Sequence, residues 1–140
     1  MTIVLGYDES PGADRALDQA ITLAGQLSDR LVVVYGAAPP SMMGEEYGAH
    51  LAALSEIGHT ALTAATEKAR AAGVDTVVEL TEDKPAEALL EAAEKYDARV
   101  IVVGTYGESP LRGAMLGSTP HKLLHWSHRP VLCVPPPERA

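Results

Sequence analysis

The sequence contains no phenylalanine, and its aromatic side chains are limited to one tryptophan and five tyrosines. Because 46% of the residues are nevertheless hydrophobic, the core must be aliphatic and built from valine, isoleucine, leucine and alanine. A length of 140 residues suits one domain, which buries about two-thirds of the surface that the unfolded chain exposes. We therefore expect residues 1–140 to form a single domain.

Cysteine is almost absent. Cys133 is the only one, which excludes an internal disulfide and fits a reducing compartment. It stands in an apolar run, so we interpret it as a core residue rather than a nucleophile. After Met1 and Thr2 the chain continues directly into the apolar residues IVLGY, without a basic region, a long apolar segment or a cleavage site. We expect a soluble, cytoplasmic protein with no membrane segment.

Clusters of positive charge are missing as well. The formal net charge is −8, and no run of like charges occurs. General binding to nucleic acid or to an anionic membrane surface is therefore not expected. A small anion is still compatible with this composition, because backbone N–H groups can bind it without any positively charged side chain.

What the sequence does contain is a regular alternation of short apolar runs and amphipathic stretches. The apolar runs predict strands at Ile3–Tyr7, Leu31–Tyr35, Asp75–Leu80, Val100–Val103 and Val131–Val134. The amphipathic stretches predict helices from Pro11 to Ser28 or Asp29, from Leu51 to Ala72, from Pro85 onward and from Thr119 to Ser127. The segment Ser41–Gly48 has no clear period and is interpreted as a loop. The alternation predicts an α/β fold, a doubly wound parallel sheet with helices on both faces.

The stretch Ala98–Leu124 combines a buried strand, a loop rich in glycine and the start of a new helix near Gly117. This is how a phosphate-binding loop is built, because glycines let the backbone approach an anion and a helix N-terminus offers unpaired N–H groups and a positive dipole end. In doubly wound sheets, ligands bind beyond the carboxyl ends of the strands. If the first and fourth strands are neighbours, the segments Gly6–Asp8 and Gly104–Gly107 face one crevice.

Two other phosphate-loop patterns are absent. The sequence has no GxxxxGK[ST] and no GxGxxG after any strand, so it is neither a Walker-type ATPase nor a dinucleotide-binding fold by motif. The glycines could also serve only to turn the chain. We favour the anion site, because Ser118 can cap the helix and Thr119 places a second hydroxyl group beside it.

The spacing Gly104-x2-Gly107-x9-Gly117-Ser118 resembles the nucleotide-binding signature of the universal stress protein family, Gly-x2-Gly-x9-Gly-Ser/Thr. The opening VLGYDESPGADRAL resembles the first strand and helix of that family, and GSTPHKLLHWSHRPVLCVP resembles its closing helix and strand. The three separated segments agree in order and spacing, and the likeness extends along the whole chain. It implies a flavodoxin-like, five-stranded parallel sheet with strand order 3-2-1-4-5.

The resemblance also implies a ligand and a function. We expect a regulatory protein of the stress-response type that binds ATP, AMP or another adenine nucleotide, with Mg or Mn held through the phosphates. Asp8 matches a position that contacts the adenosine end, and Gly36 matches one that borders the adenine. The full set of expected nucleotide-binding residues is Gly6, Asp8, Gly36, Val103, Gly104, Gly107, Arg112, Gly117, Ser118 and Thr119. Members commonly form homodimers through the last strand, here Pro130–Val134.

Any hydrolysis is expected to be slow or absent, since the sequence shows no candidate lysine at the phosphates and no obvious base for water. Two carboxylates also depart from the usual family pattern, Glu9 where glycine is common and Glu108 where neutral or basic residues are frequent. They would repel a triphosphate unless a divalent ion or Arg112 offsets them, or unless they point to solvent. They favour a first alternative, a protein-interaction subunit of the same fold that binds no nucleotide.

A second alternative is a receiver-type phosphorylation switch, since Asp8 and Glu9 resemble the acidic pair that binds magnesium in such domains. That class needs a lysine after its last strand, and VLCVPPPER has none. The carboxyl end of the third strand also lacks a clear phosphoacceptor. We therefore rank this alternative below the other two.

Three histidines near the end of the chain are candidate metal ligands. His121, His125 and His128 are spaced by four and three residues, so they could share a helix face, and histidines four apart can ligate a metal. No cysteine or carboxylate completes a tetrahedral set nearby, so we assign no metal site and interpret the histidines as a solvated face. Trp126, beside His125, is expected to be partly buried against the sheet or a partner chain.

Overall fold

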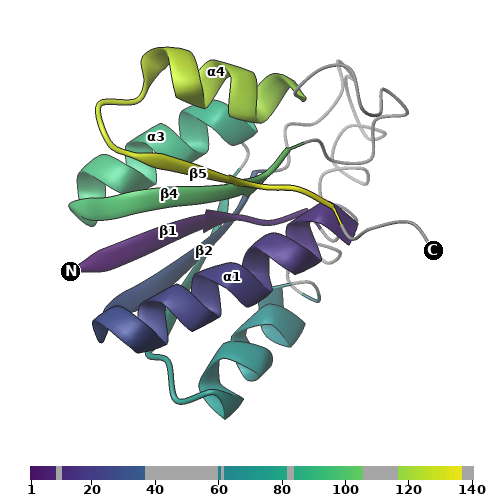
Figure 1. Cartoon of the computed structure of the whole chain (residues 1–140), viewed down its shortest axis with the longest axis vertical. Helices are drawn as coiled ribbons and strands as arrows, with labels where there is room; N and C mark the ends of the chain where they lie inside the picture. Colours follow the sequence, from purple (N-terminus) through teal and green to yellow (C-terminus); the bar gives the residue numbers. More distant parts are fainter. Residues whose placement is uncertain (9–10, 37–59, 61, 82–83, 106–116, 137–140) are drawn as a thin grey trace, which may run out of the picture.

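The computed structural model describes residues 1–8, 11–36, 60, 62–81, 84–105 and 117–136. Within them, a five-stranded parallel sheet has the order β3-β2-β1-β4-β5, and helices pack on both of its faces (Figure 1). Residues 62–71 are helical. The other described elements are β1 (Thr2–Gly6), α1 (Pro11–Leu27), β2 (Arg30–Gly36), β3 (Thr76–Thr81), α3 (Pro85–Lys95), β4 (Ala98–Gly104), α4 (Ser118–Trp126) and β5 (Val131–Val134).

This architecture confirms the predicted fold class, including the strand order 3-2-1-4-5. The predicted fourth strand, Val100–Val103, lies inside the longer β4, and the predicted last strand, Val131–Val134, coincides with β5. The expected loop Ser41–Gly48 lies outside the described residues, as does the first part of the expected helix Leu51–Ala72.

Side chains alternate between the two faces of the sheet and form two core clusters, as the period of two in a strand requires. On one face, Leu5 and Val102 pack with residues of α1 and of the helical residues 62–71. On the other face, Val4 and Ile101 pack with residues of α3 and α4. All four side chains are fully buried, and each contributes about 1.5–3 kcal/mol relative to an exposed position.

Alanine takes the place of the missing aromatic side chains where helices meet the sheet. The buried side of α1 carries alanines, namely Ala13, Ala16, Ala20 and Ala24. Their short side chains let the helix backbone lie close to the strands, so the core fills without large rings. None of the described helices is long and apolar enough to cross a membrane.

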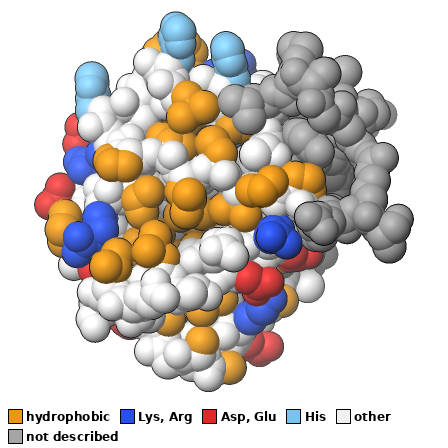
Figure 2. Space-filling view, viewed as in Figure 1, with side chains coloured by type: hydrophobic (Ala, Val, Ile, Leu, Met, Phe, Trp, Pro, Cys, Tyr) orange, Lys and Arg blue, Asp and Glu red, His pale blue; other side chains and the backbone are white. Residues whose placement is uncertain are grey.

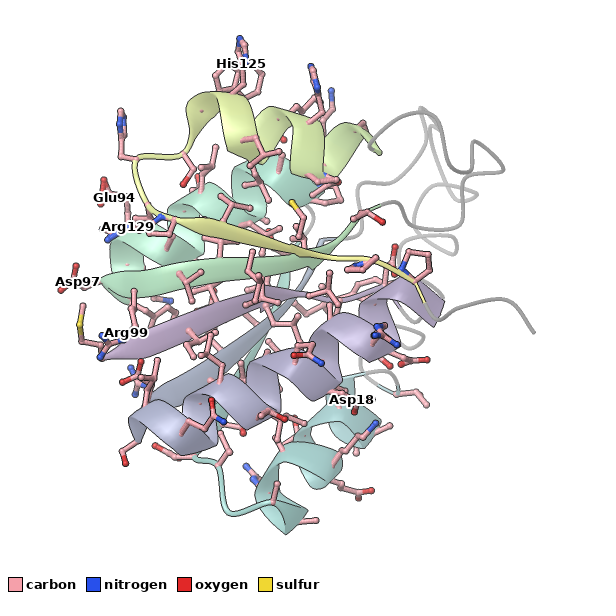
Figure 3. The ribbon with its side chains drawn as sticks, viewed as in Figure 1. Asp18, Glu94, Asp97, Arg99, His125 and Arg129 are labelled. Atoms are coloured by element: carbon pink, nitrogen blue, oxygen red, sulfur yellow. The ribbon has the colours of Figure 1, made fainter. Side chains whose placement is uncertain are left out.

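Ion pairs gather at the edge of the sheet where the strands begin (Figure 3). The carboxylate of Asp29, whose side chain is only 2% exposed, accepts a hydrogen bond of 2.7 Å from Nε of Arg99. The α-ammonium group of Met1 lies 3.2 Å from Oδ1 of the same carboxylate. The hydrogen bond from Arg99 is the main cause that lowers the pKa of Asp29, and it outweighs the opposing effect of burial.

Arg129 makes a second set of contacts at this edge. Its guanidinium donates hydrogen bonds of 3.3 Å to Oδ1 of Asp97, 3.2 Å to the carbonyl oxygen of Ala98 and 3.2 Å to Oε2 of Glu94. These bonds join the turn before β5 to the end of α3 and the start of β4. They stabilise the edge of the sheet opposite the carboxyl ends of the strands.

Of the two places expected to bury part of Trp126, the sheet or a partner chain, the sheet is excluded. Its side chain is 52% exposed and belongs to neither core cluster. The nine-residue helix α4 buries only Pro120 and Leu123, which are three residues apart and so lie on the same side of the helix. Burial of Trp126 against a partner chain stays a prediction.

Candidate functional site

The carboxyl ends of β1 and β4 lie side by side, as the crevice hypothesis requires. The two strands pair in parallel, with Leu5 opposite Val102, so the residues that follow each strand leave the sheet at the same edge. On the far side of β4, Gly104 pairs with Val134 of β5. The structure thus brings Asp8, just after β1, to the same edge as Gly104 and Thr105.

Tyr7 fixes the segment that carries Asp8. Its backbone N–H donates a hydrogen bond of 3.0 Å to the carbonyl oxygen of Val34, which extends the ladder between β1 and β2. Its hydroxyl donates a hydrogen bond of 2.7 Å to Oδ1 of Asp14 in the first turn of α1. The exposed Asp8 therefore follows a residue that is held by both the sheet and a helix.

Helices lie close to two of the predicted site glycines. A Cβ atom on Gly104 would lie 3.1 Å from the carbonyl carbon of Gly12 and 3.2 Å from its oxygen, so the missing side chain lets the first turn of α1 cross the end of β4. A Cβ atom on Gly6 would lie 2.8 Å from Cδ1 of Leu89 in α3. Gly104 therefore lets a helix backbone approach the carboxyl edge of the sheet closely, whereas the neighbour of Gly6 is the end of a flexible side chain.

A backbone hydrogen bond positions the start of α4. The N–H of Gly117, the N-cap residue, donates a bond of 2.7 Å to the carbonyl oxygen of Thr105, whose own N–H donates a bond of 3.2 Å to the carbonyl oxygen of Val134. The helix therefore begins beside the end of β4. Its N-cap is Gly117, without a side-chain cap, so the expectation that Ser118 caps the helix is wrong. Its first-turn N–H groups on Ser118 and Thr119 have no acceptor within the helix, and both residues also carry a hydroxyl group.

The charged residues in the first helical turns distinguish α4 from α1 and α3. The first turn of α1 contains Asp14 and that of α3 contains Glu87, whereas the first turn of α4 contains no acidic residue. A carboxylate in the first turn offsets the positive end of a helix dipole. Among these three helices, α4 consequently has the N-terminus at which an anion is best stabilised.

The other predicted site residues are placed as follows. Gly36 ends β2 and pairs with Thr81 of β3. The side chain of Val103 is buried in the cluster under α3 and α4, so only its backbone can face a ligand. Gly107 and Arg112 lie outside the described residues, as do Glu9 and Glu108.

The histidines of the α4 region are exposed. His121 and His125 stack with a distance of 6.0 Å between ring centroids, while His128 follows the C-cap residue Ser127 and so lies beyond the helix. Within the described part of the chain, no three histidine, cysteine, aspartate or glutamate residues are grouped so that they could hold a metal ion.

Comparison with known proteins decides the family. A family model described as the universal stress protein family matches residues 1–135. The chain belongs to this family. The match runs from β1 through β5, and it confirms the resemblance that the glycine spacing and the two terminal segments indicated.

Individual members of the universal stress protein family align over nearly the whole chain. A universal stress protein from Thermus aquaticus is 35% identical over 137 residues, which are 95% of this chain and 97% of that protein. A structure of a family member from Burkholderia pseudomallei is 30% identical with a TM-score of 0.79, and the alignment covers 96% of this chain and 95% of that one.

Some of the similar structures contain a ligand. A universal stress protein in complex with cAMP is 28% identical with a TM-score of 0.70, and the alignment covers 96% of each chain. An Archaeoglobus fulgidus protein in complex with dAMP shares the fold at 21% identity and a TM-score of 0.69, over 96% of this chain and 97% of that one. An Arabidopsis thaliana protein with AMP bound shares it at 12% identity and a TM-score of 0.73, over 98% and 92%.

Two backbone contacts of Thr105 in this universal stress protein have no counterpart in the sequence-based prediction. Thr105 was not among the expected site residues, yet its carbonyl oxygen anchors the N-cap of α4 and its N–H continues the ladder to β5. Both contacts use backbone atoms, which every residue type supplies. No side-chain pattern could therefore have indicated them.

Proposed function

We propose that this universal stress protein binds an adenine nucleotide at the carboxyl ends of β1 and β4, and that the nucleotide regulates its conformation or its choice of partner. The observation that carries the proposal is the start of α4. This helix has no acidic residue in its first turn, and the hydrogen bond from Gly117 to Thr105 holds it beside the end of β4. Backbone N–H groups at such a position bind phosphate.

Each part of the nucleotide has a candidate partner. The N–H and hydroxyl groups of Ser118 and Thr119 are donors for phosphate oxygens. The carboxylate of Asp8 suits ribose hydroxyls or the adenine amino group, and Gly36 leaves room for a flat base. Gly107 and Arg112 are proposed to complete the phosphate contacts, with Mg or Mn bridging phosphate oxygens.

The choice of adenine nucleotide has two sources of support. The similar structures hold cAMP, dAMP and AMP, which favours an adenine nucleotide as the class of ligand. ATP is the finer proposal, and it rests on the signature Gly104-x2-Gly107-x9-Gly117-Ser118. Slow or absent hydrolysis is proposed because the segment Gly104–Thr119 contains no lysine to stabilise charge on a transferred phosphoryl group.

We further propose that the chain forms a homodimer through β5. This strand is at the edge of the described sheet, and its four residues VLCV carry no charge. Figure 2 shows hydrophobic side chains gathered over the face on which β5 lies in Figure 1. An exposed edge strand without charges is a template for pairing with another chain, and a second copy is the partner that a two-fold axis provides.

A protein-interaction subunit without nucleotide is the second candidate. Glu9 and Glu108 favour it, since two carboxylates beside the proposed phosphate path oppose an anionic ligand. The two candidates differ in one observable, the response of the folded state to added nucleotide.

Thermal unfolding with and without ligand tests the proposal. A nucleotide that binds only the folded state at about a hundredfold its Kd adds about 2.7 kcal/mol of stability, which raises Tm by roughly 10 °C in a domain of this size. ATP with MgCl2, AMP and cAMP are compared with GTP, which carries the same phosphates on a different base. If none of the adenine nucleotides changes Tm at millimolar concentration, the subunit without nucleotide is the better account.

A further inference from the structure

Two histidines form a pair on the exposed side of α4. His121 and His125 are one helical turn apart, their ring centroids are 6.0 Å apart, and the angle between the ring planes is 13°. Both side chains are exposed. Figure 3 shows His125 projecting from α4 away from the sheet.

The helix under this pair is firmly attached. Pro120 and Leu123 are buried, and Leu123 is part of the cluster that also contains Ile101. Residues four apart on a helix lie on one face, so the backbone of α4 holds the two imidazoles next to each other. The rings themselves are exposed, and rotamer changes of exposed side chains are fast.

Two histidines four residues apart on one face of a helix are a recurrent pair of metal ligands. In helical His-x3-His pairs, each imidazole directs a nitrogen to a common cation at about 2.0–2.1 Å. The rings are stacked with their centroids 6.0 Å apart, so binding requires the exposed side chains to rotate until one nitrogen of each ring faces the common cation. A neutral imidazole carries a free nitrogen lone pair, which can bind a cation directly.

We propose that His121 and His125 form a two-histidine site for a divalent transition-metal ion of the late first row, namely Cu²⁺, Ni²⁺ or Zn²⁺. These cations prefer imidazole nitrogen, whereas Mg²⁺ prefers oxygen ligands and retains its water. The site is thereby chemically distinct from the Mg or Mn proposed for the nucleotide phosphates. It does not depend on nucleotide binding.

The described residues provide two ligands and no third near the pair. The remaining coordination positions are filled by water or by a donor from another molecule, as in open zinc sites. Such a site binds metal reversibly and more weakly than a structural site with four protein ligands. Affinity is expected to follow the order in which Cu²⁺ exceeds Ni²⁺ and Zn²⁺.

Calorimetric titration of the nucleotide-free protein with NiCl2 tests the site. His121→Asn and His125→Asn are each expected to lower the association constant about tenfold or more, because one of two protein ligands is lost. His128→Asn is the matched control, since it removes an exposed histidine beyond the end of the helix. It is expected to bind Ni²⁺ as the unsubstituted protein does, and MgCl2 is expected to give no binding at the pair.

His50 and His59 lie outside the described residues, so their binding is measured in the double variant His121→Asn/His125→Asn. A second readout is the broadening of histidine ring signals by substoichiometric Cu²⁺ in NMR spectra, in which His121 and His125 are expected to broaden first. Equal affinity in the double variant and the unsubstituted protein would overturn the proposal. So would an equal loss in His128→Asn, or broadening that begins at other histidines.

Discussion

The backbone N–H of Gly117 donates a hydrogen bond of 2.7 Å to the carbonyl oxygen of Thr105. This bond places the N-terminus of α4 next to the end of β4, with residues 106–116 connecting the two in the sequence. The position of the proposed phosphate site thus depends on backbone atoms of the sheet rather than on side chains of the helix. Substitutions can therefore change the space around the site without removing the bond that positions it.

Gly117→Val is expected to abolish nucleotide binding and leave the fold intact. Gly117 has φ −62° and ψ 167°, which any L-amino acid adopts without strain, and valine keeps the N–H that binds Thr105. Its branched side chain would occupy the proposed path of the phosphates. Calorimetry with millimolar ATP or AMP, alongside thermal unfolding without ligand, measures both effects.

Gly117→Ala is the control for that substitution, because it has the same backbone angles and a smaller side chain. It is expected to weaken binding less than valine does. Normal binding by the valine variant would show that the segment between β4 and α4 has been misinterpreted as a phosphate site.

Gly104→Ala and Gly25→Ala are expected to change stability in opposite directions. A Cβ atom at Gly104 meets the backbone of Gly12 at 3.1 Å, so the first turn of α1 must shift, at a cost of about 1–3 kcal/mol. A Cβ atom at Gly25 in α1 meets nothing within 4 Å, and alanine there is expected to stabilise the helix by about 0.5–1 kcal/mol. Urea unfolding measures the free energy of unfolding of each variant. An equal change in the two variants would contradict the packing role of Gly104.

Asp29→Asn is expected to destabilise the protein at neutral pH and progressively less in acid. The hydrogen bond from Arg99 lowers the pKa of Asp29 in the folded state, so the ionised carboxylate stabilises the fold above the ordinary aspartate pKa. That contribution is lost as the pH falls through the lowered pKa, because the unfolded chain then binds the proton more readily. The expected cost at neutral pH is about 1–3 kcal/mol.

Asp18→Asn is the control for the pH experiment. Asp18 pairs with Lys68, and both side chains are 53% exposed, so its replacement is expected to change stability by only about 0–1 kcal/mol. Denaturant unfolding at several pH values compares the two variants. A difference between Asp29→Asn and the unsubstituted protein that stays constant from neutral pH to acid would contradict the role assigned to the ion pair.

The fold was predictable because its signals are local. Short apolar runs such as Val131–Val134 mark buried strands, and the alternation with amphipathic stretches determines parallel pairing. The strand order came from the family resemblance rather than from periodicity. That Trp126 lies outside both core clusters could not be predicted, because a helix of nine residues has too few apolar positions to define its buried side.

For the candidate site, the sequence could only propose residues from the chemistry of their side chains, and these residues stay a prediction. Asp8, Ser118 and Thr119 could be proposed from their chemistry and position. The close approaches of Gly104 to Gly12 and of Gly6 to Leu89 involve residues far apart in the sequence, so they are visible only in the folded chain.

Dimerisation through the edge strand β5 can be tested at two exposed leucines. Leu132 is 39% exposed on this strand, and Leu124 is 53% exposed on α4. Light scattering at tens of micromolar is expected to give twice the chain mass of 14.7 kDa. Leu132→Lys is expected to give monomers, because a charge would be buried against the second copy, whereas Leu124→Lys is expected to remain dimeric. A monomeric unsubstituted protein, or monomers from Leu124→Lys alone, would exclude pairing through β5.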